Sequence, residues 1–175
     1  MTRIVILSEN MVQNSIGLLG EHGFSVWIEH QNHTYLFDTG QTGICVSNAQ
    51  EMKVPLKNIS SIILSHGHYD HCNGLEAVLT HLEKPISIYA HPLIFESKYA
   101  LRKDNSLLYI GIKFQKEYLE TRFKAQFCFS DHLTSLGPDI WMSGTVPLTN
   151  DFEKIPSSLK VMDNQELKPD LFLDD

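Results

Sequence analysis

The chain has 175 residues, and its 14 Lys and Arg against 21 Asp and Glu leave a formal net charge of −7. This length suits one globular domain with a sizeable core. The acidic balance argues against a protein that mainly binds nucleic-acid backbones, because such a protein needs a basic surface. The unusual feature is the histidine content, with nine in the chain and three of them inside residues 66–71.

The sequence carries no pattern of export or of membrane insertion. Its first apolar run is interrupted by Ser8 and Glu9, unlike the longer apolar core of a signal peptide. No stretch approaches the roughly 20 apolar residues that span a bilayer. The three cysteines are Cys45, Cys72 and Cys128, and their wide spacing suits a reducing compartment. We therefore expect a cytoplasmic protein without a membrane partner.

Apolar periodicity and turn residues predict alternating strands and helices along most of the chain. In chain order, the expected elements are strands at 3–9, 24–29 and 34–38, a helix at 44–53, a strand at 59–65, a helix at 75–82, a strand at 86–90, a helix at 116–123, and strands at 126–129 and 140–142. The pattern weakens after residue 92. No repeat or low-complexity linker divides the chain, so we expect a single α/β domain over residues 1–175.

Between residues 34 and 90 the expected elements alternate strand, helix, strand, helix, strand. Such crossovers place the three strands parallel and side by side, so their carboxyl ends meet at one edge of the sheet. Asp38, His66 and His91 lie at or directly after these strand ends. Because open α/β sheets bind ligands at this edge, a functional site is expected there.

The run His-Gly-His-Tyr-Asp-His at residues 66–71 places three imidazoles and one carboxylate directly before a helix. These groups are the ligands that borderline cations such as Zn²⁺ or Fe²⁺ accept. The intervening glycine permits a sharp turn, so that His66 and His68 can face one ion while Asp70 and His71 face a second. The alternative is a polar turn in which Asp70 or Asn73 caps the helix, although capping requires no histidine.

This run resembles the His-x-His-x-Asp-His signature of the metallo-β-lactamase superfamily. Leu36-Phe-Asp-Thr-Gly is similar to the earlier Asp motif of that superfamily. A narrower resemblance is to the dihydropterin synthase-like subgroup, which is related to the ribofuranosylaminobenzene-phosphate pterin enzyme of methanogens. The segments that carry it are Glu21-His-Gly-Phe-Ser, Leu64-Ser-His-Gly-His-Tyr-Asp-His, Tyr89-Ala-His-Pro, Trp141-Met-Ser-Gly-Thr-Val-Pro and Asp151-Phe-Glu-Lys.

The resemblance implies an αββα sandwich with one or two metal ions at the sheet edge. By position, His66 and His68 would bind the first ion, and Asp70 and His71 the second. Asp70 would also act in catalysis, by holding the second ion or by orienting the attacking water. Asp38 would orient the metal loop, although a plain turn at Asp38-Thr-Gly fits the sequence equally well. Zn²⁺ is the expected metal, with Fe or Mn as alternatives.

Two further histidines are open cases. His91 could contact a metal or the substrate, or pack at a strand end before Pro92. His22, in the Glu21-His-Gly turn, has the resemblance as its only support as a substrate or metal contact. A single histidine is weak evidence for a site.

The resemblance also implies ligands that this chain does not contain. In the family, a Gly-Cys-Ser-His-Ala-Gly type of loop and a histidine nearer the C-terminus complete the site. After His91 the only histidine here is His132, in a different context. We therefore expect only the N-terminal part of the sandwich, incomplete at its C-terminus. An oligomer, or a partner that supplies the missing half, would cover the exposed sheet surface.

The leading hypothesis is a metal-dependent hydrolase that uses a metal-activated water on a small ester- or phosphoester-type substrate. Truncation leaves open whether the chain is an active enzyme. One alternative is a non-catalytic metal-binding remnant or interaction protein. A further alternative, which depends wholly on the subgroup resemblance, is an enzyme of pterin-cofactor biosynthesis.

Overall fold

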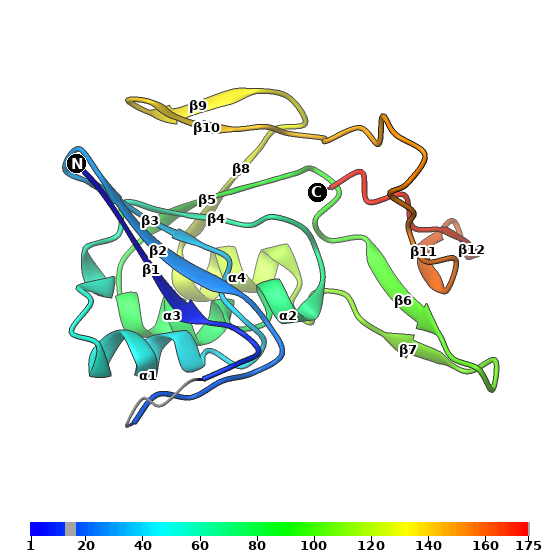
Figure 1. Cartoon of the computed structure of the whole chain (residues 1–175), viewed down its shortest axis with the longest axis horizontal. Coiled ribbons are helices and arrows are strands. Elements are labelled where there is room, and N and C mark those ends of the chain that lie inside the picture. The colour runs from blue at the N-terminus through cyan, green and yellow to red at the C-terminus, as the bar shows by residue number, and fades with distance from the viewer. Residues whose placement is uncertain (13–16, 175) are drawn as a thin grey trace.

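The computed structural model describes residues 1–12 and 17–174 (Figure 1). In chain order, its elements are β1 (Thr2–Ser8), β2 (Ser25–His30), β3 (His33–Phe37), α1 (Ile44–Glu51), a 3₁₀ turn (Leu56–Asn58), β4 (Ser61–Ile63), α2 (Tyr69–Cys72), α3 (Leu75–Leu82), β5 (Ile86–Ala90), β6 (Ser97–Leu101), β7 (Leu107–Tyr109), α4 (Lys116–Phe123), β8 (Ala125–Phe129), β9 (Thr134–Gly137), β10 (Ile140–Met142), β11 (Leu159–Asp163) and β12 (Glu166–Pro169). None of these helices combines the length and the apolar character that a membrane span requires.

The main sheet has the strand order β1-β2-β3-β4-β5-β8. Strands β1 to β3 pair antiparallel, and the turn between β2 and β3 holds Gln31 and Asn32 at positive φ, as two-residue hairpin turns require. From β3 onward, neighbouring strands are parallel. The expected pair of β-α-β crossovers is therefore confirmed, and the carboxyl ends of β3, β4 and β5 lie at one edge.

Two of the expected elements have a boundary that is wrong by two residues, and both errors have a local cause. The helix predicted at 44–53 ends at Glu51, because the chain turns through a left-handed conformation at Lys53. The strand predicted at 59–65 is paired only over Ser61–Ile63. Beyond it, the Ile63 carbonyl accepts a hydrogen bond from the Asp38 N–H, and the chain then leaves the sheet toward the histidine run.

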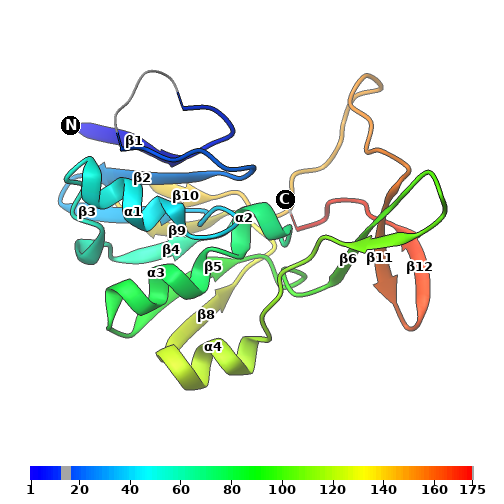
Figure 2. The same cartoon turned by 90° about the horizontal axis from the view of Figure 1, so that it is seen from below.

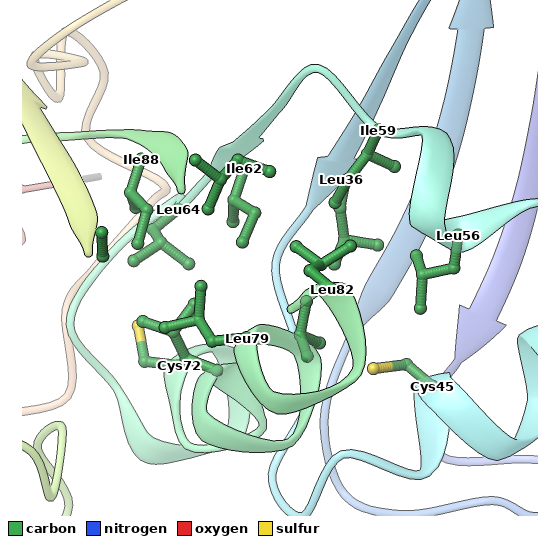
Figure 3. Close-up of a cluster of buried hydrophobic side chains, with 14 of the residues drawn as sticks. Leu36, Cys45, Leu56, Ile59, Ile62, Leu64, Cys72, Leu79, Leu82 and Ile88 are labelled. Carbon is green, nitrogen blue, oxygen red and sulfur yellow. The ribbon is translucent and has the colours of Figure 1, made fainter. Parts of the chain in front are cut away.

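Helices α1, α3 and α4 cover one face of the main sheet (Figures 1 and 2). In α3, the buried side chains recur three and four residues apart, at Leu75, Val78, Leu79 and Leu82. Figure 3 shows Leu79 and Leu82 among the side chains of the sheet. Each fully buried aliphatic side chain contributes roughly 1.5–3 kcal/mol of burial free energy. The packing of this helix layer therefore stabilises the sheet and the edge at which β3, β4 and β5 end.

The β9–β10 hairpin lies over the opposite face of the main sheet (Figure 1). A cavity of about 380 Å³ is lined by Phe37 and Ile63 of the sheet and by Leu136 and Trp141 of the hairpin. The layers are thus helices, sheet and a small second β layer. This is the expected α/β architecture of the N-terminal part of an αββα sandwich.

Four strands form a separate sheet in the order β12-β11-β6-β7, beside the main sheet (Figure 2). Together with β9, these strands are missing from the predicted elements. Their sequences are short or polar, and Lys98 interrupts the apolar pattern of β6. After β12, the chain returns toward α2, where the described residues end (Figure 2).

Candidate metal centre

The candidate site is built on the shared edge of β3, β4 and β5. Asp38 follows β3 and His66 follows β4 after two residues. Helix α2 then carries Asp70 and His71. The helices α2 and α3 begin after His68 and Gly74, and neither start has a side-chain capping hydrogen bond. The alternative in which Asp70 or Asn73 acts as a cap is therefore wrong.

His66 and His68 are brought together as the sequence predicts. Their Nε2 and Nδ1 atoms lie 3.0 Å apart, and both residues are buried. Gly67 is required between them, because an added Cβ would collide with the carbonyl oxygen of Ile94. The Gly67 N–H donates to Asp174 Oδ2 at 2.8 Å. The turn at Gly67 therefore packs against the Ile94 carbonyl and is hydrogen-bonded to Asp174, while the two imidazoles face each other.

Asp38 is fully buried and connects this loop to α2. Its Oδ1 accepts a hydrogen bond from Ser65 N, and its Oδ2 accepts one from Ser65 Oγ, each at 2.8 Å. His71 Nδ1 lies 2.7 Å from the same Oδ2. Asp38 also has a positive φ at the start of its turn, so the turn and the orienting contacts occur together. The orienting role itself stays a prediction.

Asp70 lies between two imidazoles. Its Oδ2 is 3.5 Å from His71 Nε2 and 3.4 Å from His22 Nε2. The side chain of His22 is 63% exposed, while that of Asp70 is mostly buried. The structure thus places His22 beside the expected second-metal residues, and its role as a metal or substrate contact stays a prediction.

His91 lies at the same sheet edge but has different neighbours. Its Nε2 is 3.0 Å from Thr145 Oγ1, and its Nδ1 accepts a hydrogen bond from Leu93 N at 3.1 Å. The residue is buried and lines the cavity under the β9–β10 hairpin. Its place fits packing at the strand end, and its role as a metal or substrate contact stays a prediction.

Three charged residues near the histidines were not identified from the sequence. Lys98 of β6 is completely buried, and its Nζ contacts the carboxylates of Asp170 and Asp174. Asp170 Oδ2 also lies 3.7 Å from His68 Nε2. No local motif marks these residues, because the ion pairs join positions 72 and 76 residues apart.

Burial and neighbouring charged groups together set the charge states in this cluster. Burial, together with the imidazoles of His71 and His68, lowers the pKa of His66 to about 4. Burial alone would raise the pKa of Asp170, but contacts with His68, the Phe172 N–H and Lys98 outweigh it and hold that pKa well below its usual value. Burial opposes the charge on Lys98 too, and the two carboxylates outweigh it and raise the pKa of Lys98.

The hydrogen-bond pattern fits the binding of a cation. Ser65 Oγ gives its proton to Asp38, so at 3.0 Å from His66 Nδ1 it serves as an acceptor for that nitrogen's proton. In neutral His66, Nε2 then presents a lone pair toward His68 Nδ1. Two imidazole nitrogens in this arrangement require a proton or a metal ion between them. The donor chemistry therefore fits a metal such as zinc.

The donors nevertheless do not form a complete ligand set. Among residues 1–12 and 17–174, no group of three or more His, Cys, Asp or Glu side chains is arranged as a metal site. A catalytic zinc ion usually has three protein ligands. His66 and His68 would supply two, and their role as ligands stays a prediction.

Comparisons with known proteins identify the family of the chain. The sequence matches the family model described as metallo-beta-lactamase superfamily over residues 19–146. It is 34% identical over 176 residues to an uncharacterized protein of Methanocaldococcus jannaschii, covering 97% of this chain and 64% of that protein. It is 30% identical over 158 residues to the 7,8-dihydropterin-6-methyl-4-(beta-D-ribofuranosyl)-aminobenzene-5'-phosphate synthase of the same organism, covering 87% of this chain and 52% of that enzyme.

Solved structures also resemble this chain, and the match described here covers its full length. The matched structure is a crystal structure of a metal-dependent hydrolase of the beta-lactamase superfamily, with a TM-score of 0.76 and 27% identity. The match covers 100% of this chain and 59% of that one. The chain therefore spans about half to two thirds of the length of these relatives.

Proposed function

The chain belongs to the metallo-β-lactamase superfamily, and on that premise we propose that it acts as a metal-dependent hydrolase on a small ester- or phosphoester-type substrate. The observation that carries the proposal is the 3.0 Å approach of His66 Nε2 to His68 Nδ1 at the carboxyl edge of the parallel strands. Further support comes from the relative of similar fold that is named as a metal-dependent hydrolase.

In this proposal, His66 and His68 hold one ion and Asp70 and His71 hold a second. Zinc suits this mixture of imidazole and carboxylate, with iron or manganese as alternatives. When bound, such a metal supplies Lewis acidity and lowers the pKa of water to about 7.

The remaining steps belong to the side chains of the chain itself. Asp38 accepts the proton of His71 Nδ1, which turns His71 Nε2 toward Asp70. In this proposal, Asp70 holds a metal or orients the attacking water through a hydrogen bond. Burial keeps His66 neutral, which is the state in which an imidazole binds a metal.

A role in pterin-cofactor biosynthesis is a second candidate. Its support is the 30% identity with the dihydropterin ribofuranosylaminobenzene-phosphate synthase over 158 residues. The chain spans 52% of that enzyme. Binding of a pterin phosphate, measured by fluorescence titration, would favour this candidate over a general hydrolase.

A non-catalytic metal-binding remnant or interaction protein is the third candidate. The observation in its favour is that the described residues contain no complete three-ligand group. It predicts metal binding without turnover of phosphodiester, thioester or lactone substrates.

The test is zinc analysis of the purified chain after loading and removal of free metal. We expect about one or more zinc ions per chain in the wild type and a loss in His68→Ala. His132→Ala is the control, because His132 is an exposed histidine away from the loop. Zinc content below about one per chain, unaltered by His68→Ala, would contradict the metal site.

A further inference from the structure

Lys98 lies buried on β6 between two carboxylates of the C-terminal segment. Its Nζ is 2.8 Å from Asp174 Oδ1 and 3.1 Å from Asp170 Oδ2. All three side chains are almost completely buried. One positive charge therefore faces two negative charges in an environment where unpaired charges are costly.

The same two carboxylates reach the histidine loop. Asp174 Oδ2 accepts a hydrogen bond from the Gly67 N–H at 2.8 Å, and Asp170 Oδ2 lies 3.7 Å from His68 Nε2. Between them, the Phe172 ring packs edge-on against His68 with 5.2 Å between ring centroids. The C-terminal segment is thus anchored on the loop at three points.

We propose that Asp170 is a positioning residue for His68. Its negative charge keeps a proton on His68 Nε2, so that Nδ1, the nitrogen facing His66 Nε2, is the one available to a metal. Lys98 and Asp174 hold the segment that carries Asp170. This inference depends on the proposed function, in which His66 and His68 bind a metal ion.

The burial of His68 Nε2 supports this role. Among the described residues, this nitrogen has no hydrogen-bond partner, and Asp170 provides the carboxylate that approaches it. A proton on Nδ1 alone would turn the Nε2 lone pair toward the carboxylate, and the two like partial charges would repel each other. Metal-binding histidines commonly have a carboxylate at the ring nitrogen that does not bind the metal. A distance of 3.7 Å makes this contact electrostatic rather than a hydrogen bond.

Asp170→Asn is the informative variant, because it removes one of the two negative charges and leaves Lys98 paired with Asp174. Lys98→Met is unsuitable, since it would leave two buried carboxylates without a counter-ion. Asp163→Asn is the matched control, because Asp163 is a half-exposed aspartate of the same β11–β12 pair and pairs with Lys168 rather than with the histidine loop.

The first measurement is zinc affinity by competition with a chelating dye, with thermal unfolding as the check on folding. We expect Asp170→Asn to weaken zinc binding about 10- to 100-fold. Asp163→Asn should bind zinc like the wild type. Zinc affinity of a folded Asp170→Asn protein equal to that of the wild type would overturn the proposal.

The second measurement needs no metal. In ¹⁵N-histidine-labelled, metal-free protein, long-range ¹H–¹⁵N spectra report which nitrogen of His68 carries a proton, with His68→Ala used for assignment. We expect a proton on Nε2 of the wild type, in addition to the proton that lies between His68 Nδ1 and His66 Nε2 when no metal is present. In Asp170→Asn we expect a larger population with a bare Nε2. A bare Nε2 in the wild type would refute the role of Asp170, even if Asp170→Asn fails to fold. If the wild type binds no zinc, the proposed function is wrong, and the spectrum still decides how Asp170 acts on His68.

Discussion

His71 Nδ1 lies 2.7 Å from Oδ2 of the fully buried Asp38. This contact joins the end of β3 to α2, two elements that are separated by 33 positions in the sequence. Ser65 donates two more hydrogen bonds to the same carboxylate. One buried side chain thereby sets both the path of the loop after β4 and the orientation of a candidate ligand.

Asp38→Asn should weaken metal binding and lower stability together. Asn has one acceptor oxygen where Asp38 uses two, so its NH2 group must face either Ser65 N or the pair Ser65 Oγ and His71 Nδ1. With the NH2 group beside His71 Nδ1, His71 would move its proton to Nε2 and could no longer bind a metal through that nitrogen. We expect zinc affinity to fall about 10- to 100-fold and the free energy of unfolding to fall by about 1–3 kcal/mol. Chelator competition and urea denaturation measure the two effects. Asp139→Asn, at an exposed aspartate, is the control, and unchanged zinc affinity in Asp38→Asn would contradict the orienting role.

The sequence predicts the centre of this site because its parts are either contiguous or joined by regular topology. The run at residues 66–71 supplies four candidate ligands in one loop. Asp38 can be assigned to the same edge because parallel crossovers bring strand ends together. Lys98 and Asp170 carry no such signal. Their pairing is a tertiary contact across 72 positions, and a buried lysine in a strand has the same sequence appearance as an exposed one.

The strands also divide into those that the sequence predicts and those that it does not. Apolar alternation identifies β5 directly, since Ile86, Ile88 and Ala90 are buried and the residues between them are less so. Strand β12 has four exposed residues and ends in Pro169, so no burial pattern marks it. It is a strand because β11 offers it a hydrogen-bonding edge, and only the folded chain provides that edge.

Gly67→Ala should damage the loop between His66 and His68. The added methyl group would meet the carbonyl oxygen of Ile94, which belongs to the backbone and cannot rotate away. We expect a loss of about 1–3 kcal/mol in the free energy of unfolding, with weaker zinc binding. Thermal unfolding and chelator competition measure these effects. Gly20→Ala is the control, because its nearest neighbour is the movable side chain of Val12; equal losses in the two variants would contradict the steric explanation.

The three cysteines should differ in their reactivity. Burial raises the pKa of Cys45 to about 12 and that of Cys72 well above its usual value, while Cys128 is partly exposed. A thiol-reactive disulfide reagent at pH 8 should therefore label Cys128 quickly in the folded protein. It should label Cys45 and Cys72 only after denaturation. Fast labelling of the folded Cys128→Ser variant would contradict this order.

The raised pKa of Cys45 also predicts a dependence of stability on alkaline pH. The folded state holds the thiol proton more tightly than the unfolded state. The contribution of the protonated Cys45 to the free energy of unfolding is therefore complete below pH 9 and is lost as pH rises toward about 12. Denaturation curves across this range should show that the free energy of unfolding falls less steeply with pH in Cys45→Ala than in the wild type. In Cys128→Ala the free energy of unfolding should fall as steeply as in the wild type. Equal slopes for Cys45→Ala and the wild type would contradict the prediction.

The β9–β10 layer leads to a prediction about association. Trp141 of this hairpin is 60% exposed beside the apolar cavity, and surfaces of this kind are commonly covered by another chain. We expect self-association on size-exclusion chromatography and protection of Trp141 from acrylamide quenching at high protein concentration. Trp27 is buried, so it provides a constant background.

Trp141→Ser should shift the chain toward the monomer, whereas Leu19→Ser, at an exposed apolar residue elsewhere, should leave association unchanged. A compact, heat-resistant monomer of 20.0 kDa with Trp141 quenched at every concentration would contradict the prediction. Association that persists in Trp141→Ser would place the interface away from the hairpin, because a hydrophobic contact centred on an aromatic side chain weakens when that side chain is removed.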